Sequence, residues 1–211
     1  MHQNKLGILD DDNYNKILKY IYNFYVCYNI IGEEKSNKLE DVVYKYSKKV
    51  EEEYSIEIIK EFLSSLKEKL PNFEWFEKAF KNVGWSNHTG IYEGDKTKAR
   101  VKIVLEIIEK HTSARTTIDD FTIEHILLDS EDNKNSQIGN LIPLEGTLNH
   151  RCGSKSLDQK IPIYEESNFK TARNIAKRFK DKPFNVETRT SFLAKKIYNE
   201  ILDLKTFGDI K

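Results

Sequence analysis

The residues with the clearest chemical potential lie between positions 121 and 160. Glu124 and His125 follow a short apolar run, and an Asn/His pair, Asn149 and His150, stands further along the chain. Histidine titrates near neutral pH and can take a proton from water. Carboxylate and amide oxygens, completed by water, suit Mg²⁺ or Mn²⁺. The segment therefore predicts a base beside a divalent metal, the combination that attack on a phosphodiester requires.

The spacing of these residues limits how they can meet. Neighbours on a regular strand point to opposite faces, so Glu124 and His125 reach one centre only if the strand end is twisted or bulged. Asn140 either accepts from the imidazole or braces the loop that holds it. Asn149 or His150 completes the metal shell from a following helix, and the spacing leaves both open.

The local composition predicts the element that positions these groups. After Ala114 the residues at 116–118 and 121–123 favour extended backbone, whereas the acidic, Asn-rich segment 129–136 favours a loop. A second apolar run at 138–144 indicates another strand, on which Asn140 would lie. A short helix can start at Glu145. The order β, β, α is expected between 121 and 160.

Hydrophobic periodicity predicts helices for most of the remaining chain, with a loop at 84–95. Asp11 or Asp12, Asn72, Ser167 and Asn185 are the expected N-caps. The inner faces are expected to include Leu18, Ile21, Tyr25, Val43 and Phe192. The expected helices are 12–31, 36–53, 56–70, a short one after Asn72, 96–111, 168–180 and 186–204. We predict a mainly α protein that contains a small ββα motif.

The series TIEHI, IGNLIPL, LN and GSKSLDQK resembles the HNH, or ββα-metal, nucleases. Within them it is similar to the C-terminal nuclease domain of GmrSD-like restriction and phage-defence proteins. The resemblance implies a DNA endonuclease that uses Mg²⁺ or Mn²⁺. It implies that His125 is the general base, that Glu124 with Asn149 or His150 holds the metal, and that Asn140 positions His125.

The same resemblance implies the DNA contacts and the domain division. Lys160, Lys155, Arg151 and Arg189 would meet phosphate. Residues 1–114 would form a helical linker or support region, and residues 115–211 the nuclease with its C-terminal helices. Such proteins carry an N-terminal nucleotide-dependent sensor with a DGQQR-type motif, which is absent here, so this chain is expected to be the effector half. Leu128 and Asp129 stand where the family often has Pro-Gln.

Composition is compatible with DNA binding without requiring it. The net charge is zero, but residues 151–211 carry 14 Lys and Arg against 8 Asp and Glu. Cys27 and Cys152 form no CxxC pair and are expected to be free, buried thiols. No apolar run is long enough to span a membrane, so a cytoplasmic location is the default. The alternatives are a non-catalytic DNA- or protein-binding module with a decayed nuclease fold, and a hydrolase of small phosphoesters.

Overall fold

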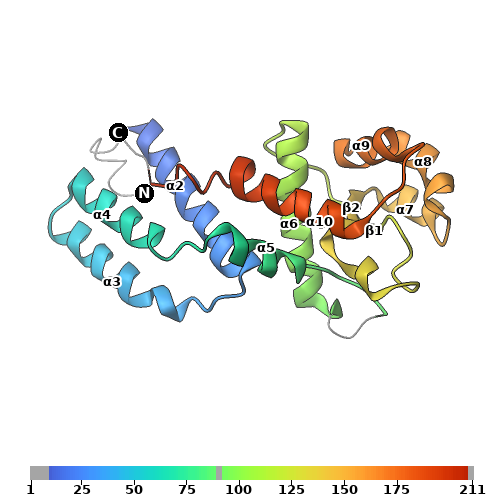
Figure 1. Cartoon of the computed structure of the whole chain (residues 1–211). Helices are drawn as coiled ribbons and strands as arrows, with labels where there is room; N and C mark the ends of the chain where they lie inside the picture. The colour runs from blue at the N-terminus through green and yellow to red at the C-terminus, as the bar shows by residue number, and fades with distance from the viewer. Residues whose placement is uncertain (1–9, 89–91, 209–211) are drawn as a thin grey trace. The chain divides into compact units, whose positions relative to one another are not determined.

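The structure, a computed structural model, describes residues 10–88 and 92–208. The chain divides into two compact units, one formed by residues 1–76 with 198–211 and the other by residues 77–197. Most of the described residues lie in helices, and two strands form a small sheet (Figure 1). The predicted fold class, mainly α with a small ββα element, is confirmed. Residues 89–91 of the predicted loop 84–95 lie outside the described residues.

The first unit is built from helices packed around an aromatic core. The core cluster contains Ile17, Phe24, Tyr28, Leu63, Leu66 and Phe207. The helical segments are α2 (Asp11–Tyr25), which continues as a π-helix (Val26–Ile31), α3 (Asn37–Glu52), α4 (Ile56–Lys67), the first residues of α5 (Phe73–Lys81) and a second π-helix (Ile197–Ile201) at the unit boundary. Aromatic residues therefore form a core here, as the sequence predicts.

Two details of this unit differ from the predictions. The N-cap of α2 is Asp10, whose side chain accepts from the backbone N of Asn13, in place of Asp11 or Asp12. Leu18, Ile21 and Tyr25 are exposed, as is Val43 on α3. The buried stripe of α2 runs through Ile17 and Phe24, and the exposed residues lie on another face of the same helix. The predicted cap of α5, Asn72, is confirmed by its bond to the backbone N of Trp75.

The second unit surrounds the sheet with helices. Strands β1 (Thr122–His125) and β2 (Leu141–Leu144) pair antiparallel, with His125 opposite Leu141. Short 3₁₀ turns (Asn133–Ser136 and Ile138–Asn140) precede β2. The helices are α6 (Asp95–Ser113), α7 (Gly146–Cys152), α8 (Leu157–Glu165), α9 (Lys170–Phe179) and α10 (Val186–Lys196). The order β, β, α is confirmed, although Asn140 lies in the turn before β2.

Helix α6 belongs to the unit that contains the sheet. It packs against β2 and α9, and its buried Glu109 accepts hydrogen bonds from the backbone N of Lys170 and Thr171 at the start of α9. This cap replaces the predicted cap Ser167, which accepts instead from Phe169 N. The grouping of α6 with the sheet differs from the predicted division between residues 114 and 115, because the contacts of α6 are long-range in sequence.

Helix α10 closes over the turn that leads into β2. A Cβ at Gly139 would overlap Thr190 Oγ1 and the carbonyl of Val186, so only glycine allows this approach. Asn185 caps α10 as predicted, by accepting from Thr188 N. Phe192, predicted to face inward, is 49% exposed.

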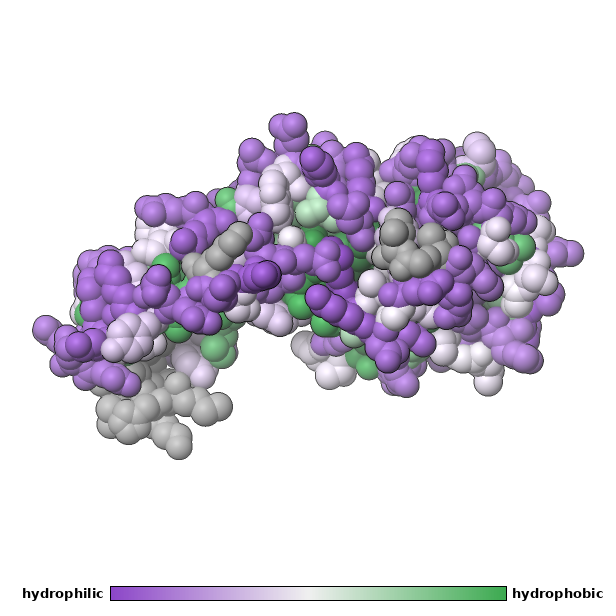
Figure 2. Space-filling model, turned by 90° about the horizontal axis from the view of Figure 1, so that it is seen from below, coloured by the Kyte–Doolittle hydropathy of each residue, from purple (hydrophilic) through white to green (hydrophobic). Residues whose placement is uncertain are grey.

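The polarity of the surface and the burial of the two thiols are as expected from the composition. Hydrophilic residues cover most of the face shown in Figure 2, and hydrophobic residues appear there in scattered areas. Among the described residues no helix is long and apolar enough to cross a membrane. Cys27 and Cys152 are free and buried, as predicted.

Candidate active site at the end of strand β1

A cavity of about 520 Å³ lies where β1 meets α7. Both His125 and Glu124 line it, together with Asn149 and His150 from α7. The end of β1 thus brings the two adjacent side chains to one cavity, as the predicted chemistry requires. Helix α6 contributes Lys98 and Lys102, and the segment before α6 contributes Trp85 and Asn87.

The imidazole of His125 is fixed by the segment that precedes α6. Its Nε2 lies 2.9 Å from the carbonyl oxygen of Trp85, and the two rings lie 5.5 Å apart at 30°. A carbonyl oxygen only accepts, so Nε2 carries the proton in this arrangement. Nδ1 of the neutral ring is then the basic nitrogen. Its side chain is 14% exposed, so solvent can still reach it.

Trp85 reaches His125 because a short stretch of backbone pairing holds its segment. Gly84 forms an isolated antiparallel bridge with Gln137. The backbone N of Trp85 donates to the carbonyl of Ser136 at 2.9 Å, and Ile138 N donates to the Val83 carbonyl at 2.8 Å. Trp85 has no local signal in the sequence, because its contact with His125 spans 40 positions.

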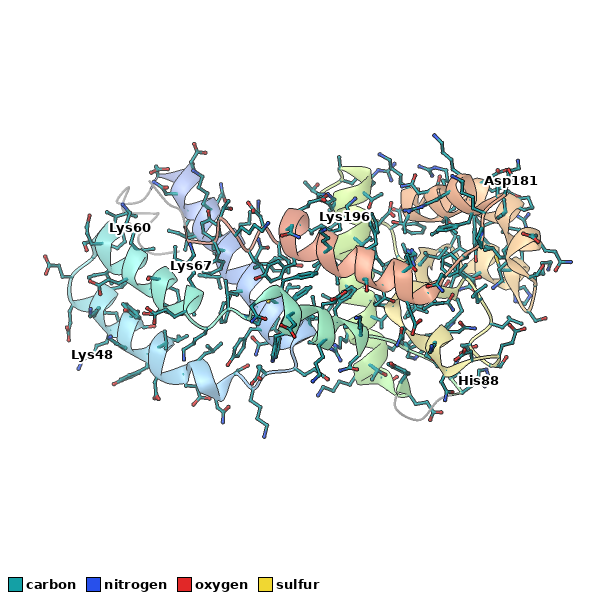
Figure 3. All side chains as sticks on the ribbon, viewed as in Figure 1. Lys48, Lys60, Lys67, His88, Asp181 and Lys196 are labelled. Carbon is teal, nitrogen blue, oxygen red and sulfur yellow. The ribbon has the colours of Figure 1, made fainter. Side chains whose placement is uncertain are left out.

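Asp129 is a second residue that the sequence did not single out. Its Oδ2 lies 3.7 Å from His125 Nε2 and accepts from Ser86 Oγ at 2.8 Å. Its Oδ1 lies 4.0 Å from Nε2 of His88, a residue labelled in Figure 3. Asp129 occupies one of the two positions that depart from the Pro-Gln pattern. That departure, four residues after His125, was the available signal.

Asn140 braces the loop that follows His125. Its Oδ1 accepts from Leu127 N at 2.8 Å, and its Nδ2 donates to the carbonyls of Leu127 and Asn135, both at 2.7 Å. The side chain is fully buried. Of the two roles considered for Asn140, loop bracing is the one observed, and its amide makes no contact with the imidazole among the described residues.

Asn149 is held against β1, whereas His150 is exposed. Asn149 Nδ2 donates to Thr122 Oγ1 at 2.8 Å and to the Ile123 carbonyl at 3.0 Å. The carbonyl partner requires the amide nitrogen on that side, so Oδ1 is the oxygen that remains for a ligand in the cavity. His150 lines the same cavity from an exposed position on α7. This geometry favours Asn149 over His150 as the third residue.

Glu124 and Lys160, which both line the cavity, form a buried ion pair. Glu124 Oε1 lies 2.8 Å from Lys160 Nζ and accepts from the Tyr164 hydroxyl at 2.8 Å. Lys160 Nζ also donates to the carbonyl of His125 at 2.6 Å. Burial and the adjacent Glu124 carboxylate raise the pKa of the Tyr164 hydroxyl, so it remains a donor. Both contacts of Glu124 use Oε1.

Lys160, one of the predicted phosphate contacts, is buried in the wall of the cavity. Its side chain is 1% exposed, and the Glu124 carboxylate compensates its charge. Arg189 is likewise buried: its Nη1 donates to the carbonyls of Gly139 and Leu141. Sequence patterns assign lysine and arginine to the surface by default, because only the folded chain reveals the partners that make burial possible.

The other two predicted phosphate contacts lie at the surface. Arg151 makes a two-point pair with Glu166, at 2.6 and 2.7 Å. This pair raises the pKa of Arg151 and lowers that of Glu166. Lys155 Nζ donates to the Arg151 carbonyl at 2.6 Å and is exposed. Both side chains remain accessible to a polyanion.

The oxygen donors at the cavity fit a hard cation in part. Glu124 offers a carboxylate and Asn149 an amide oxygen, and such ligands with water suit Mg²⁺ or Mn²⁺. Among the described residues no group of three His, Cys, Asp or Glu side chains is placed to hold a metal ion. A site here would therefore rely on the amide and on water for most of its coordination.

In this helical unit a histidine ends the first strand of the ββα element, and an amide side chain lies on the helix that follows the second strand. The chain belongs to the family described as GmrSD restriction endonucleases, C-terminal domain, whose profile matches residues 85–196. This family assignment confirms the resemblance to the GmrSD C-terminal domain noted in the sequence. No curated protein and no solved structure matches the chain significantly.

Proposed function

We propose that the second unit hydrolyses DNA phosphodiesters with the help of Mg²⁺ or Mn²⁺, and that His125 is the general base. Membership in a family of restriction endonucleases supports a nuclease. The observation that carries the proposal is the contact between His125 Nε2 and the Trp85 carbonyl. This contact fixes one tautomer and leaves Nδ1 as the basic nitrogen of a residue that lines the same cavity as Glu124 and Asn149.

The protein groups divide the chemistry between them. Nδ1 of His125 takes the proton of the attacking water, and the ring becomes positively charged. Asp129, 3.7 Å from the opposite nitrogen, stabilises that charge. Asn140 holds the loop between His125 and Asp129 through Leu127. The Asp129 carboxylate therefore keeps its distance from the His125 imidazole.

Glu124 and Asn149 would hold the metal. Both side chains have fixed partners: the Tyr164 hydroxyl and Lys160 hold Glu124, and Thr122 with the Ile123 carbonyl holds Asn149. Such supporting contacts orient ligands before the ion arrives. When bound, the cation would stabilise negative charge on the phosphoryl and leaving oxygens.

The DNA backbone would meet lysines of α6 and the end of α7. Lys98 and Lys102 line the cavity itself, and Lys155 lies exposed beyond it. Lysine and arginine side chains that contact phosphate position a nuclease on DNA without reading its sequence. The proposal includes a controlling N-terminal nucleotide-dependent sensor, on another domain or subunit, as the resemblance implies.

Nicking of supercoiled plasmid tests the proposal directly. The full chain is incubated with plasmid and Mg²⁺ or Mn²⁺, alongside His125→Ala and the matched control His111→Ala, an exposed histidine of α6. We expect nicking by the wild type and the control, and its loss in His125→Ala with an unchanged circular dichroism spectrum. Nicking by His125→Ala at the wild-type rate would refute the assigned base. Intact plasmid with every metal, together with retained DNA binding, would favour the non-catalytic module.

A further inference from the structure

A second cavity, of about 450 Å³, lies in the same unit between α6, α9 and α10. Figure 1 shows these three helices among those that surround the sheet. Among the described residues that line the cavity none is acidic, and four are cations: Lys177, Arg178, Arg189 and Lys196. Figure 3 labels Lys196 on α10. The cavity therefore presents a positive wall.

Arg189 is the deepest of these cations. It is 8% exposed, and its two protein contacts, to the carbonyls of Gly139 and Leu141, both use Nη1. No carboxylate pairs with it among the described residues. Burial lowers the pKa of Arg189 to about 10, so the guanidinium is charged at neutral pH. A buried cation without a counter-charge is unfavourable, and an anion in the cavity would supply that charge.

Thr171 adds an unsatisfied hydrogen-bonding group to the same lining. It is 6% exposed, and its Oγ1 has no hydrogen-bond partner in the part of the chain that the structure describes. Buried polar groups are normally paired, because an unpaired one loses its bonds to water. Charge and hydroxyl together specify an oxyanion as the polar part of a ligand.

The apolar part of the cavity has flat surfaces. Phe192 is 49% exposed, and the Arg178 guanidinium lies 5.4 Å from its ring and 5.5 Å from that of Phe179. Ile175 and Leu193 line the same cavity and are buried. Exposed aromatic rings and planar guanidinium groups are the surfaces on which nucleobases stack.

We propose that this cavity binds a single nucleotide, with its phosphate toward Arg189 and its base against Phe192. The nucleotide can be free or part of a DNA strand. The strand source rests on the proposed nuclease function, whereas the free source does not. Arg189 also holds the turn before β2, so its substitution would disturb the sheet, and the test uses residues at the rim.

Calorimetric titration of the full chain at low salt separates the ligands. The probes are dTMP, inorganic phosphate and a short single-stranded oligothymidylate. We expect a nucleotide probe to bind roughly tenfold more tightly than phosphate, because its base can stack on an aromatic ring. Phe192→Ala should abolish this advantage, and Arg178→Ala and Lys196→Ala should weaken binding of all probes. Lys182→Ala, an exposed lysine outside the cavity, is the control for loss of one charge.

The outcomes distinguish the sources and the two proposals. Tight binding of dTMP that depends on Phe192 supports a free nucleotide, and the same dependence for the oligonucleotide alone supports a strand. Three results would overturn the nucleotide site. They are equal affinity for phosphate and for both nucleotide probes, no binding of dTMP or of the oligonucleotide, and wild-type affinity of Phe192→Ala for these two probes. His125→Ala should keep full affinity for dTMP. Absence of plasmid nicking by a wild type that binds dTMP would remove the nuclease function and leave this site.

Discussion

His125 donates through Nε2 to the carbonyl of Trp85, 40 positions earlier in the chain, at 2.9 Å. A backbone carbonyl cannot change its role from acceptor to donor, so this contact selects the tautomer without a titratable partner. The tautomer of His125, the proposed base, therefore depends on the backbone pairing of residues 83–85 with 136–138. Asp129 lies beside the same nitrogen and supplies charge.

We predict that Asp129→Asn lowers the rate of plasmid nicking by roughly 10- to 100-fold, the range typical of a group that orients and stabilises another side chain. The amide keeps the size of the side chain but removes the charge that stabilises protonated His125. Single-turnover nicking at saturating DNA measures the effect. Glu131→Gln is the matched control, because Glu131 is an exposed carboxylate of the same loop. An equal rate in Asp129→Asn would exclude an electrostatic role for Asp129.

Asn149→Ala should weaken the use of the metal, whereas Asn140→Ala should lower the stability of the fold. Asn149→Ala removes a proposed ligand, so the metal concentration for half-maximal nicking should rise about tenfold or more. Asn140→Ala leaves buried backbone groups of Leu127 and Asn135 unpaired, and should lower the free energy of unfolding by about 1–3 kcal/mol. Metal titrations and urea unfolding measure the two effects. An unchanged metal midpoint in Asn149→Ala would transfer the ligand role to His150.

Lys160→Met should destabilise the second unit by about 3–5 kcal/mol, because it leaves the buried Glu124 carboxylate without its cation. Adding Glu124→Gln should recover part of this loss. Each unit has one tryptophan, so Trp85 fluorescence in a Trp75→Phe background follows the second unit alone. If the double variant lost the sum of the two single losses, the pair would not be coupled.

The buried thiol of the first unit predicts a loss of stability at high pH. Burial raises the pKa of Cys27 from 9.0 to about 12. Between these values the unfolded thiol ionises and the folded one does not, so the stabilisation is complete below pH 9 and falls as the pH rises toward 12. The loss is at most about 1.4 kcal/mol per pH unit. Urea unfolding at pH 8 and pH 10, followed by Trp75 in a Trp85→Phe background, measures it. A Cys27→Ala variant should lose less between the two pH values.

The sequence predicted the features that repeat locally. Helical periodicity located most helices, and Asn72 and Asn185 identified two helix starts. The order of strands and helix between 121 and 160 followed from composition, and the motifs indicated the family. These features depend on residues close together in the chain, where spacing alone carries the information.

The sequence did not predict the contacts made across the fold. Glu109 caps α9 from 61 positions away, and Lys160 pairs with Glu124 in the interior, at 2.8 Å. A charged side chain is placed at the surface unless its partner is known, and neither partner is visible from spacing. The short helix expected from Glu145 ends at Gly153, with φ at 47°, and α8 follows it as a helix that the sequence did not predict.

The buried bond from Lys160 to the His125 carbonyl makes the site a cooperative part of the unit. The Lys160 ammonium on α8 holds both the backbone of His125 and the carboxylate of Glu124. Local opening of α8 would release both at once, so amide hydrogens of β1 and α8 should exchange with solvent at a common rate. The proposed active site at the end of β1 would then persist only as long as α8 remains packed against it.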